Sequence, residues 1–120
     1  MTPDSFRTKI FFNMRNGFLI GLFLAMATLA VYWQVTGHAF LIYDDASYVT
    51  ENRHIQDKFT LESVIWAFTT VRDSNWHPLT WLSHMLDIRL YGMNAGGHHL
   101  TSLFFHIANT LLLFIVFNKI

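Results

Sequence analysis

The chain has 120 residues, of which 52% are hydrophobic and only 13% charged, and its formal net charge is zero. Soluble domains carry about 25% charged residues, so this composition favours a membrane protein. The balanced charge gives no basic excess of the kind that nucleic-acid-binding proteins show. The absence of cysteine excludes a disulfide framework and a thiolate metal site.

The N-terminal part of the chain is a basic leader followed by an apolar stretch. Residues 1–16 carry Arg7, Lys9 and Arg15, and we expect this leader to lie in the cytoplasm. Residues 17–35 are apolar, and about 19 residues at roughly 1.5 Å each cross a hydrocarbon core of roughly 30 Å. The sequence therefore predicts a transmembrane helix at 17–35.

A cleaved signal peptide is the alternative interpretation of this apolar stretch. Signal peptides have an apolar region of about 7–15 residues, which is shorter than the stretch observed here. No convincing small-x-small cleavage site precedes Phe40. Both observations favour an uncleaved helix, with Tyr32 and Trp33 as anchors at the far interface.

A second apolar stretch predicts another transmembrane helix at 99–117. Residues 118–120 then return the chain to the cytoplasm, where Lys119 agrees with the positive-inside rule. His106 and Asn109 are three residues apart inside this helix and share one face, and polar groups at such depth normally contact other helices. We therefore expect this chain to be the N-terminal piece of a larger multi-pass protein.

Residues 36–98 form a long loop between the two spans, expected on the non-cytoplasmic side. Most connections have about 4–6 residues, so this loop needs structure of its own. Thr60 is a typical N-cap, and a helix is predicted after it. Its apolar stripe consists of Leu61, Val64, Ile65 and Phe68.

A second loop helix is predicted from Pro78 to about Leu90, with Gly92 as its terminator. Its two faces differ in polarity, as in an interfacial helix that hides the apolar face in lipid or protein. The apolar face carries Leu79, Leu82, Leu86 and Leu90, and the polar stripe carries Thr80, Ser83, His84 and Asp87. The predicted fold is all-α and integral to the membrane: two transmembrane helices joined by a long non-cytoplasmic loop with short amphipathic interfacial helices.

Two adjacent acids, Asp44 and Asp45, follow the first span closely and are the leading catalytic candidates. Ionised groups close to hydrocarbon are avoided unless they are paired or used. One carboxylate can take a proton from an acceptor hydroxyl, and a second carboxylate beside it raises its pKa. The alternative is that the two acids cap a turn or a helix start.

Seven histidines raise the question of a metal site. The pairs His98–His99 and His77–His84 lack the His-x-x-x-His spacing with a nearby Glu, so no metal site is predicted. His84 and Asp87 are three residues apart and are expected to pair along the polar stripe.

Trp76 and Trp81 are expected to be interfacial anchors, and stacking on a sugar is the alternative role for these two side chains.

Three motifs, in this order, resemble the start of membrane glycosyltransferases of the GT-C superfamily. They are Tyr43-Asp44-Asp45 with Tyr48-Val49 and Asn52, then His77-Pro78-Leu79-Thr80, then Leu90-Tyr91-Gly92-Met93-Asn94 running into Gly97-His98-His99-Leu100 and His106. The chain looks most like members that carry tetratricopeptide repeats behind a multi-pass membrane half, similar to the protein O-mannosyltransferases. No such repeat is present in these residues.

The resemblance implies a polyprenyl-phosphate sugar donor, an acceptor protein or glycan, and a first-loop acid as catalytic base. This role falls on Asp44 or Asp45, and we favour Asp44 as the base, with Asp45 as its partner in positioning substrate or shifting the pKa. Members of the family often carry Arg where His77 stands and an aromatic residue where His98 stands. The candidate substrate-binding residues are His77, His84, Asp87, His98 and His99.

The remaining expectations concern partners and location. The partners are membrane lipid and the other transmembrane helices of the full-length chain, with no nucleic acid, and the location is a bacterial inner membrane. No cofactor is assigned, and a divalent cation is the one candidate, because a carboxylate pair can serve a metal or work without one. The alternative function is a two-helix membrane scaffold or assembly subunit whose loop binds a partner.

Overall fold

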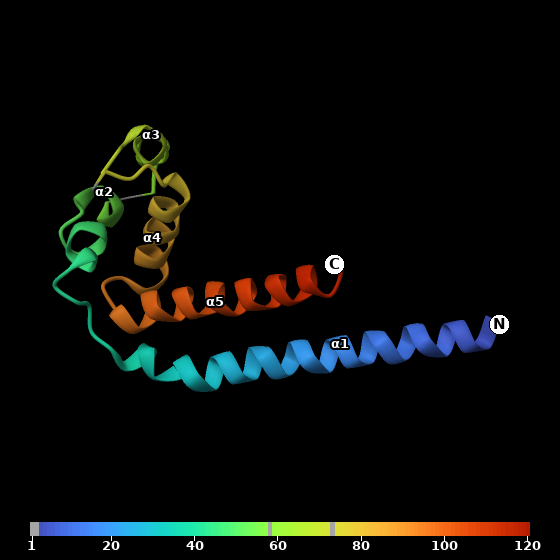
Figure 1. The fold of residues 1–120 in the computed structure, drawn as a ribbon. Coiled ribbons are helices and arrows are strands. Elements are labelled where there is room, and N and C mark those ends of the chain that lie inside the picture. Colours follow the sequence, from blue (N-terminus) through green and yellow to red (C-terminus); the bar gives the residue numbers. More distant parts are fainter. Residues whose placement is uncertain (1–2, 58, 73) are drawn as a thin grey trace. The chain divides into compact units, whose positions relative to one another are not determined.

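A computed structural model of the chain describes residues 3–57, 59–72 and 74–120. Most of these residues are helical, and apart from an isolated bridge between Arg72 and Asn75 the described residues contain no β-structure. The all-α prediction is therefore confirmed for the described residues. The elements in chain order (Figure 1) are α1 (Pro3–Tyr32), η1 (Trp33–Gly37), η2 (Ala46–Thr50), α2 (Arg53–Gln56), α3 (Leu61–Thr69), α4 (Pro78–Tyr91) and α5 (Ala95–Phe117).

The chain divides into two compact units, each described by itself. The span unit comprises Met1–Trp33 and Ser102–Ile120, and the middle unit comprises Gln34–Thr101. Two segments, Arg15–Gly37 and Ala95–Phe117, are long and apolar enough to cross a membrane. This confirms two apolar helices of spanning length, and most of the large apolar side chains described along them are exposed.

The helices of the span unit are antiparallel. A cavity of about 540 Å³ is lined both by residues near the start of the first span, such as Gly17, and by residues that follow the second, such as Lys119. Towards the other end of α1, the rings of Tyr32 and His106 meet edge to face with centroids 4.9 Å apart. The start of the first span, two residues after Arg15, and Lys119 consequently lie at the same end of this unit. Figure 1 shows the N-terminal part of α1 and the C-terminal end of α5 on this side.

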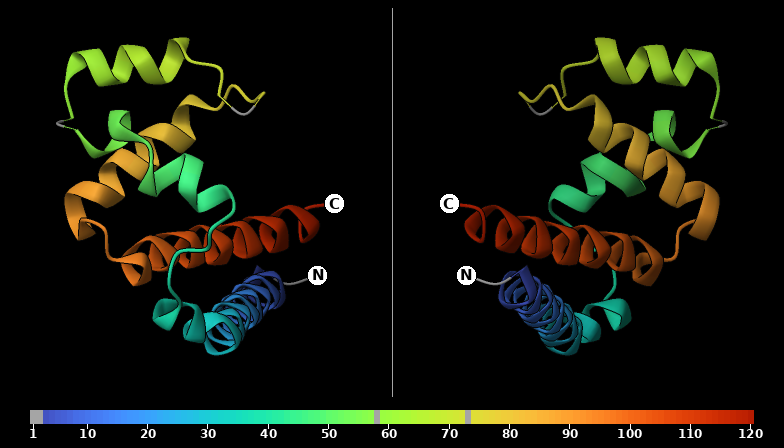
Figure 2. Two further views of the ribbon diagram at one scale, coloured as in Figure 1. Left: turned by 90° about the vertical axis from the view of Figure 1, so that its left-hand side faces the viewer. Right: turned by 90° about the vertical axis from the view of Figure 1, so that its right-hand side faces the viewer.

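The middle unit is built around α4, which packs against α2, α3 and η2 (Figure 2). Each element contributes a buried apolar side chain to one cluster, which consists of Val49, Ile55, Ala67, Trp81 and Met85. The Trp81 side chain is 0% exposed and is the largest fully buried group. The prediction that Trp81 is an interfacial anchor is therefore wrong, because its ring fills the centre of this core.

Helix α3 begins where the sequence predicts, but its apolar stripe does not face the core. The backbone N–H of Ser63 donates to Thr60 Oγ1 (3.3 Å), and the N–H of Thr60 donates to Ser63 Oγ (2.7 Å), which completes a capping box. The residues turned inward are Ser63 and Ala67, whose small size lets α3 approach its neighbours. The exposed side chains are Leu61, Ile65 and Phe68.

Helix α4 also has the predicted ends and an outward apolar face. Pro78 is its first residue, and Gly92 ends it with φ +60°, a left-handed conformation that favours glycine. Leu79, Leu86 and Leu90 are exposed. The polar stripe, in contrast, includes the buried Asp87, so the candidate site lies on the inner face of α4.

Candidate functional site: a buried histidine and aspartate cluster

The centre of the candidate site is a cluster of His84, Asp87 and His98. His84 and Asp87 lie three residues apart on α4 and so share a face. After Gly92 the chain reverses, and α5 begins at Ala95, earlier than predicted, so that His98 lies in its first turn. Each residue offers one ligand atom, and these atoms lie within 4.8 Å of one another.

The reversal between α4 and α5 requires a residue without a side chain at Gly97. A Cβ atom at this position would collide with the ring of Tyr91, so the backbone of α5 passes closer to α4 than any larger residue permits. This close approach brings His98 opposite Asp87. The tight glycine turn thus assembles the cluster from two helices.

Hydrogen bonds fix the orientation of two members of the cluster. His98 Nε2 lies 2.9 Å from the carbonyl oxygen of Gly92. A carbonyl only accepts, so this nitrogen carries the proton and donates it. Thr101 Oγ1 donates to Asp87 Oδ1 (2.7 Å), while Asp87 Oδ2 lies 3.9 Å from His98 Nδ1. Asp87 and His98 are 4% and 5% exposed, so water reaches neither of them freely.

Burial favours the neutral form of the His84 imidazole. Burial lowers its pKa below the ordinary value of 6.5, and this effect exceeds the opposing pull of the nearby Asp87 carboxylate. His98 and His77 lower the pKa further, while Asp45 raises it. Among the described residues, the buried His84 Nδ1 has no hydrogen-bond partner.

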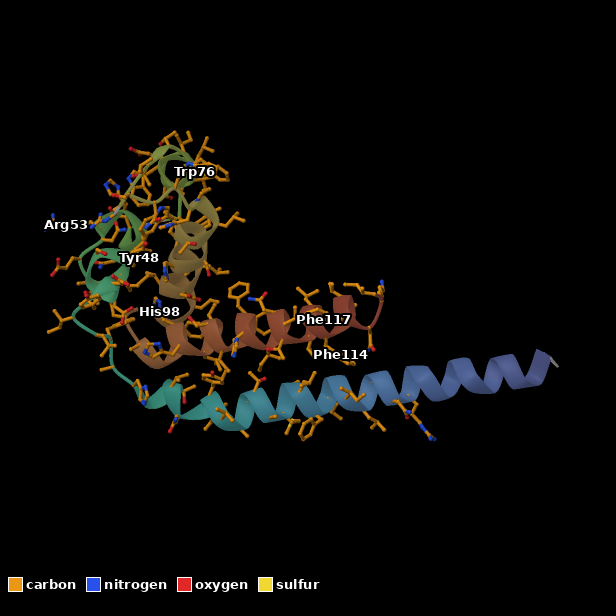
Figure 3. All side chains as sticks on the ribbon, viewed as in Figure 1. Tyr48, Arg53, Trp76, His98, Phe114 and Phe117 are labelled. Carbon is orange, nitrogen blue, oxygen red and sulfur yellow. The ribbon has the colours of Figure 1, made fainter. Side chains whose placement is uncertain are left out.

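Aromatic rings cover this cluster. Tyr48 projects from η2 towards α4 (Figure 3), and its ring centroid lies 5.3 Å from that of His77 and 6.1 Å from that of His84. Phe40 meets the His98 ring at 5.2 Å. The segment that carries the acid pair therefore lies beside the histidines of α4 and α5.

The two acids occupy different surroundings. Asp45 is partly buried, its Oδ2 accepts the backbone N–H of Leu41 (2.8 Å), and its charge acts on His84. Asp44 is exposed, and its backbone carbonyl accepts the hydroxyl of Ser47 (3.2 Å). Asp45 thus closes a turn, as the capping alternative predicts, and also lies near the cluster.

The structure brings most of the sequence-predicted site residues together. Electrostatic contact with His84 links Asp45, His77, Asp87 and His98. The closest partners of Asp87 are Thr101 and His98 rather than the expected His84. Outside this set are Asp44, which is exposed, and His99, whose ring lies 6.2 Å from Phe40.

Sequence reasoning missed one residue of the site and assigned no role to a second buried polar residue. Thr101 follows His98 by three residues and so shares its helical face, which is the signal that identifies it. Asn52 is 0% exposed, and neither polar atom of its amide has a hydrogen-bond partner in the described part of the chain. Asn52 belongs to the first motif, but the motif predicts no role for it.

Comparison of the chain with family models, with curated proteins and with solved structures finds no match. The functional interpretation therefore depends on the site chemistry and on the motif resemblance. Two imidazoles and a carboxylate can hold a cation, contact a phosphate or relay a proton. An adjacent exposed carboxylate can act as a base.

Proposed function

We propose that this chain is the first part of an integral-membrane glycosyltransferase of the GT-C type. It moves a sugar from a polyprenyl-phosphate donor to an acceptor hydroxyl on a protein or glycan. The observation that carries the proposal is the convergence of three separate motifs. Tyr48 of the first motif contacts His77 of the second motif and also the ring of His84. The His84 ring in turn stacks on His98 of the third motif, with centroids 6.3 Å apart.

The proposed orientation follows from charge. Arg15 and Lys119 lie at one end of the span unit and would face the cytoplasm of a bacterial cell. The middle unit would then lie on the periplasmic side. The exposed leucines of α4 favour contact with lipid or with further helices of the same protein.

In the proposed reaction, the Asp44 carboxylate removes the proton of the acceptor hydroxyl as that oxygen bonds to the sugar's anomeric carbon. The bond from that carbon to the lipid phosphate breaks, and the phosphate leaves with the electron pair. Asp44 is exposed and so is open to an acceptor, while Asp45 holds the turn that presents it. His77 and His99 each have a buried Nε2 without a partner among the described residues, and either ring can donate to the phosphate.

The test is a transfer assay on membranes that contain the full gene product. The donors are undecaprenyl phosphate carrying radiolabelled mannose, glucose or galactose, in separate reactions, and label in protein and glycan is counted. We expect at least one donor to give incorporation that membranes with an empty vector lack. Equal counts with and without the gene product for all three donors would contradict the proposal.

The scaffold alternative is favoured by one observation, the exposed apolar face of α4. It predicts that Asp44→Asn leaves binding of the partner intact, whereas Leu86→Asp abolishes this binding by placing a charge on the exposed apolar face of α4. The enzyme proposal predicts the reverse order for sugar transfer. Comparison of these two variants therefore separates the two functions.

A further inference from the structure

We infer that His84, Asp87 and His98 form a binding site for a first-row divalent cation, with Zn²⁺ as the best match. The cation site is independent of the proposed sugar transfer, because it depends only on the three ligand residues and on the hydrogen bonds that orient them. Two imidazole nitrogens and one carboxylate oxygen are ligands that Zn²⁺ accepts readily. Mg²⁺ and Ca²⁺ prefer sites made of oxygen atoms, which this cluster does not provide.

The spacing of the three ligand atoms suits a metal after a small adjustment. They lie within 4.8 Å of one another. Ligand bonds of about 2.0–2.1 Å in a tetrahedral site place ligand atoms roughly 3.3–3.5 Å apart. Side-chain movements of about 1 Å, within ordinary rotamer adjustment, would close the cluster around an ion.

His98 makes the hydrogen bond that is typical of a histidine bound to a metal. Its Nε2–H donates to the Gly92 carbonyl, so in the neutral ring the lone pair is on Nδ1. Nδ1 lies 3.9 Å from Asp87 Oδ2. Metal-bound histidines typically donate their other N–H to a backbone carbonyl, and a cation between Nδ1 and Oδ2 would be coordinated by both atoms.

The burial of the Asp87 carboxyl group also favours a cation site. Asp87 is 4% exposed, and its ion-pair partner among the described residues is the His98 imidazole, which is charged only when protonated. A buried carboxylate is costly unless it is paired or binds a metal. Thr101 holds Oδ1 through its hydroxyl and leaves Oδ2 directed towards the histidines. A dication at this point would neutralise the carboxylate.

A site with three protein ligands has an open coordination position. Structural zinc sites are normally closed by four protein ligands, whereas three ligands leave room for water or a substrate oxygen. The three-ligand set therefore predicts an exchangeable fourth ligand, such as water or a phosphate oxygen. Inorganic phosphate is the simplest probe of this position.

The experiment is a zinc titration of the full gene product, purified in detergent and stripped of metal with a chelator. We expect one high-affinity Zn²⁺ per chain by calorimetry, not displaced by excess Mg²⁺. Co²⁺ should bind competitively with the strong visible absorption typical of four-coordinate cobalt, and inorganic phosphate should perturb this spectrum. Loss of one ligand in His84→Gln or His98→Gln should weaken Zn²⁺ binding about 100-fold or more. Thr101→Val removes the hydrogen bond to Asp87 and should weaken Zn²⁺ binding about 10-fold.

His99→Gln is the matched control, because His99 neighbours His98 but lies outside the cluster. It should bind Zn²⁺ as the unchanged protein does, and circular dichroism should show equal helix content in all variants. The inference is overturned if the unchanged protein binds no Zn²⁺, or if His98→Gln and His99→Gln bind it equally well. Because no sugar is transferred in this titration, either result leaves the transfer assay to decide the enzyme proposal.

Discussion

Replacing Trp81 with alanine is expected to lower the free energy of unfolding of the middle unit by about 3–5 kcal/mol. The indole is fully buried, and its ring lies 5.0 Å from that of Tyr48, 5.5 Å from that of Trp66 and 4.8 Å from that of His77. Its removal would leave a cavity where α3, α4 and η2 meet. Chemical denaturation in detergent micelles, followed by circular dichroism, measures the loss.

Trp76→Ala is the matched control for this substitution. Its side chain is 61% exposed, and its Nε1 donates to the carbonyl of Phe68 (2.9 Å). Loss of this hydrogen bond should cost only about 1 kcal/mol. Equal destabilisation by the two substitutions would show that Trp81 does not anchor the core.

The Asp44→Asn substitution is expected to reduce sugar transfer about 100-fold or more, because an amide cannot accept the acceptor's proton. Folding should be unchanged, since the Asp44 side chain is exposed. The measurement is the initial rate of transfer in membranes with equal amounts of the gene product, compared at saturating donor. A normal rate would remove Asp44 from the role of base.

Two substitutions of Asp45 distinguish positioning from catalysis. The Asp45 carboxylate accepts the N–H of Leu41, and an asparagine oxygen can accept the same hydrogen bond, whereas alanine cannot. Asp45→Ala should therefore slow transfer far more than Asp45→Asn does. Equal loss in both variants would mean that the charge of Asp45 is essential, and the role of base would pass to it.

The ends of α3 and α4 could be predicted from the sequence because they depend on local chemistry. A threonine that caps α3, a proline that begins α4 and a left-handed glycine that ends it act within a few residues of their own position. The two apolar helices were equally predictable, because spanning length is a property of a continuous stretch. Each of these features is independent of the rest of the fold.

The inward faces could not be predicted in the same way. The rule that apolar side chains point inwards assumes water outside, yet α4 exposes Leu79 and Leu86 while it buries Asp87. The spacing rule for metal sites assumes ligands on one helix, whereas His98 reaches His84 only through the tight reversal at Gly97. Both depend on tertiary contacts that a single segment does not contain.

In the proposed orientation, the two spans hold the acid-bearing middle unit on the opposite side of the membrane from both chain ends. The chain has no cysteine, so single cysteines can be placed without background, at the exposed Glu51 and at Asn118. Spheroplasts carrying Glu51→Cys or Asn118→Cys are treated with a membrane-impermeant maleimide before and after lysis. We predict that Glu51→Cys reacts before lysis and Asn118→Cys only after it, and labelling of both positions on the same side would contradict the claim.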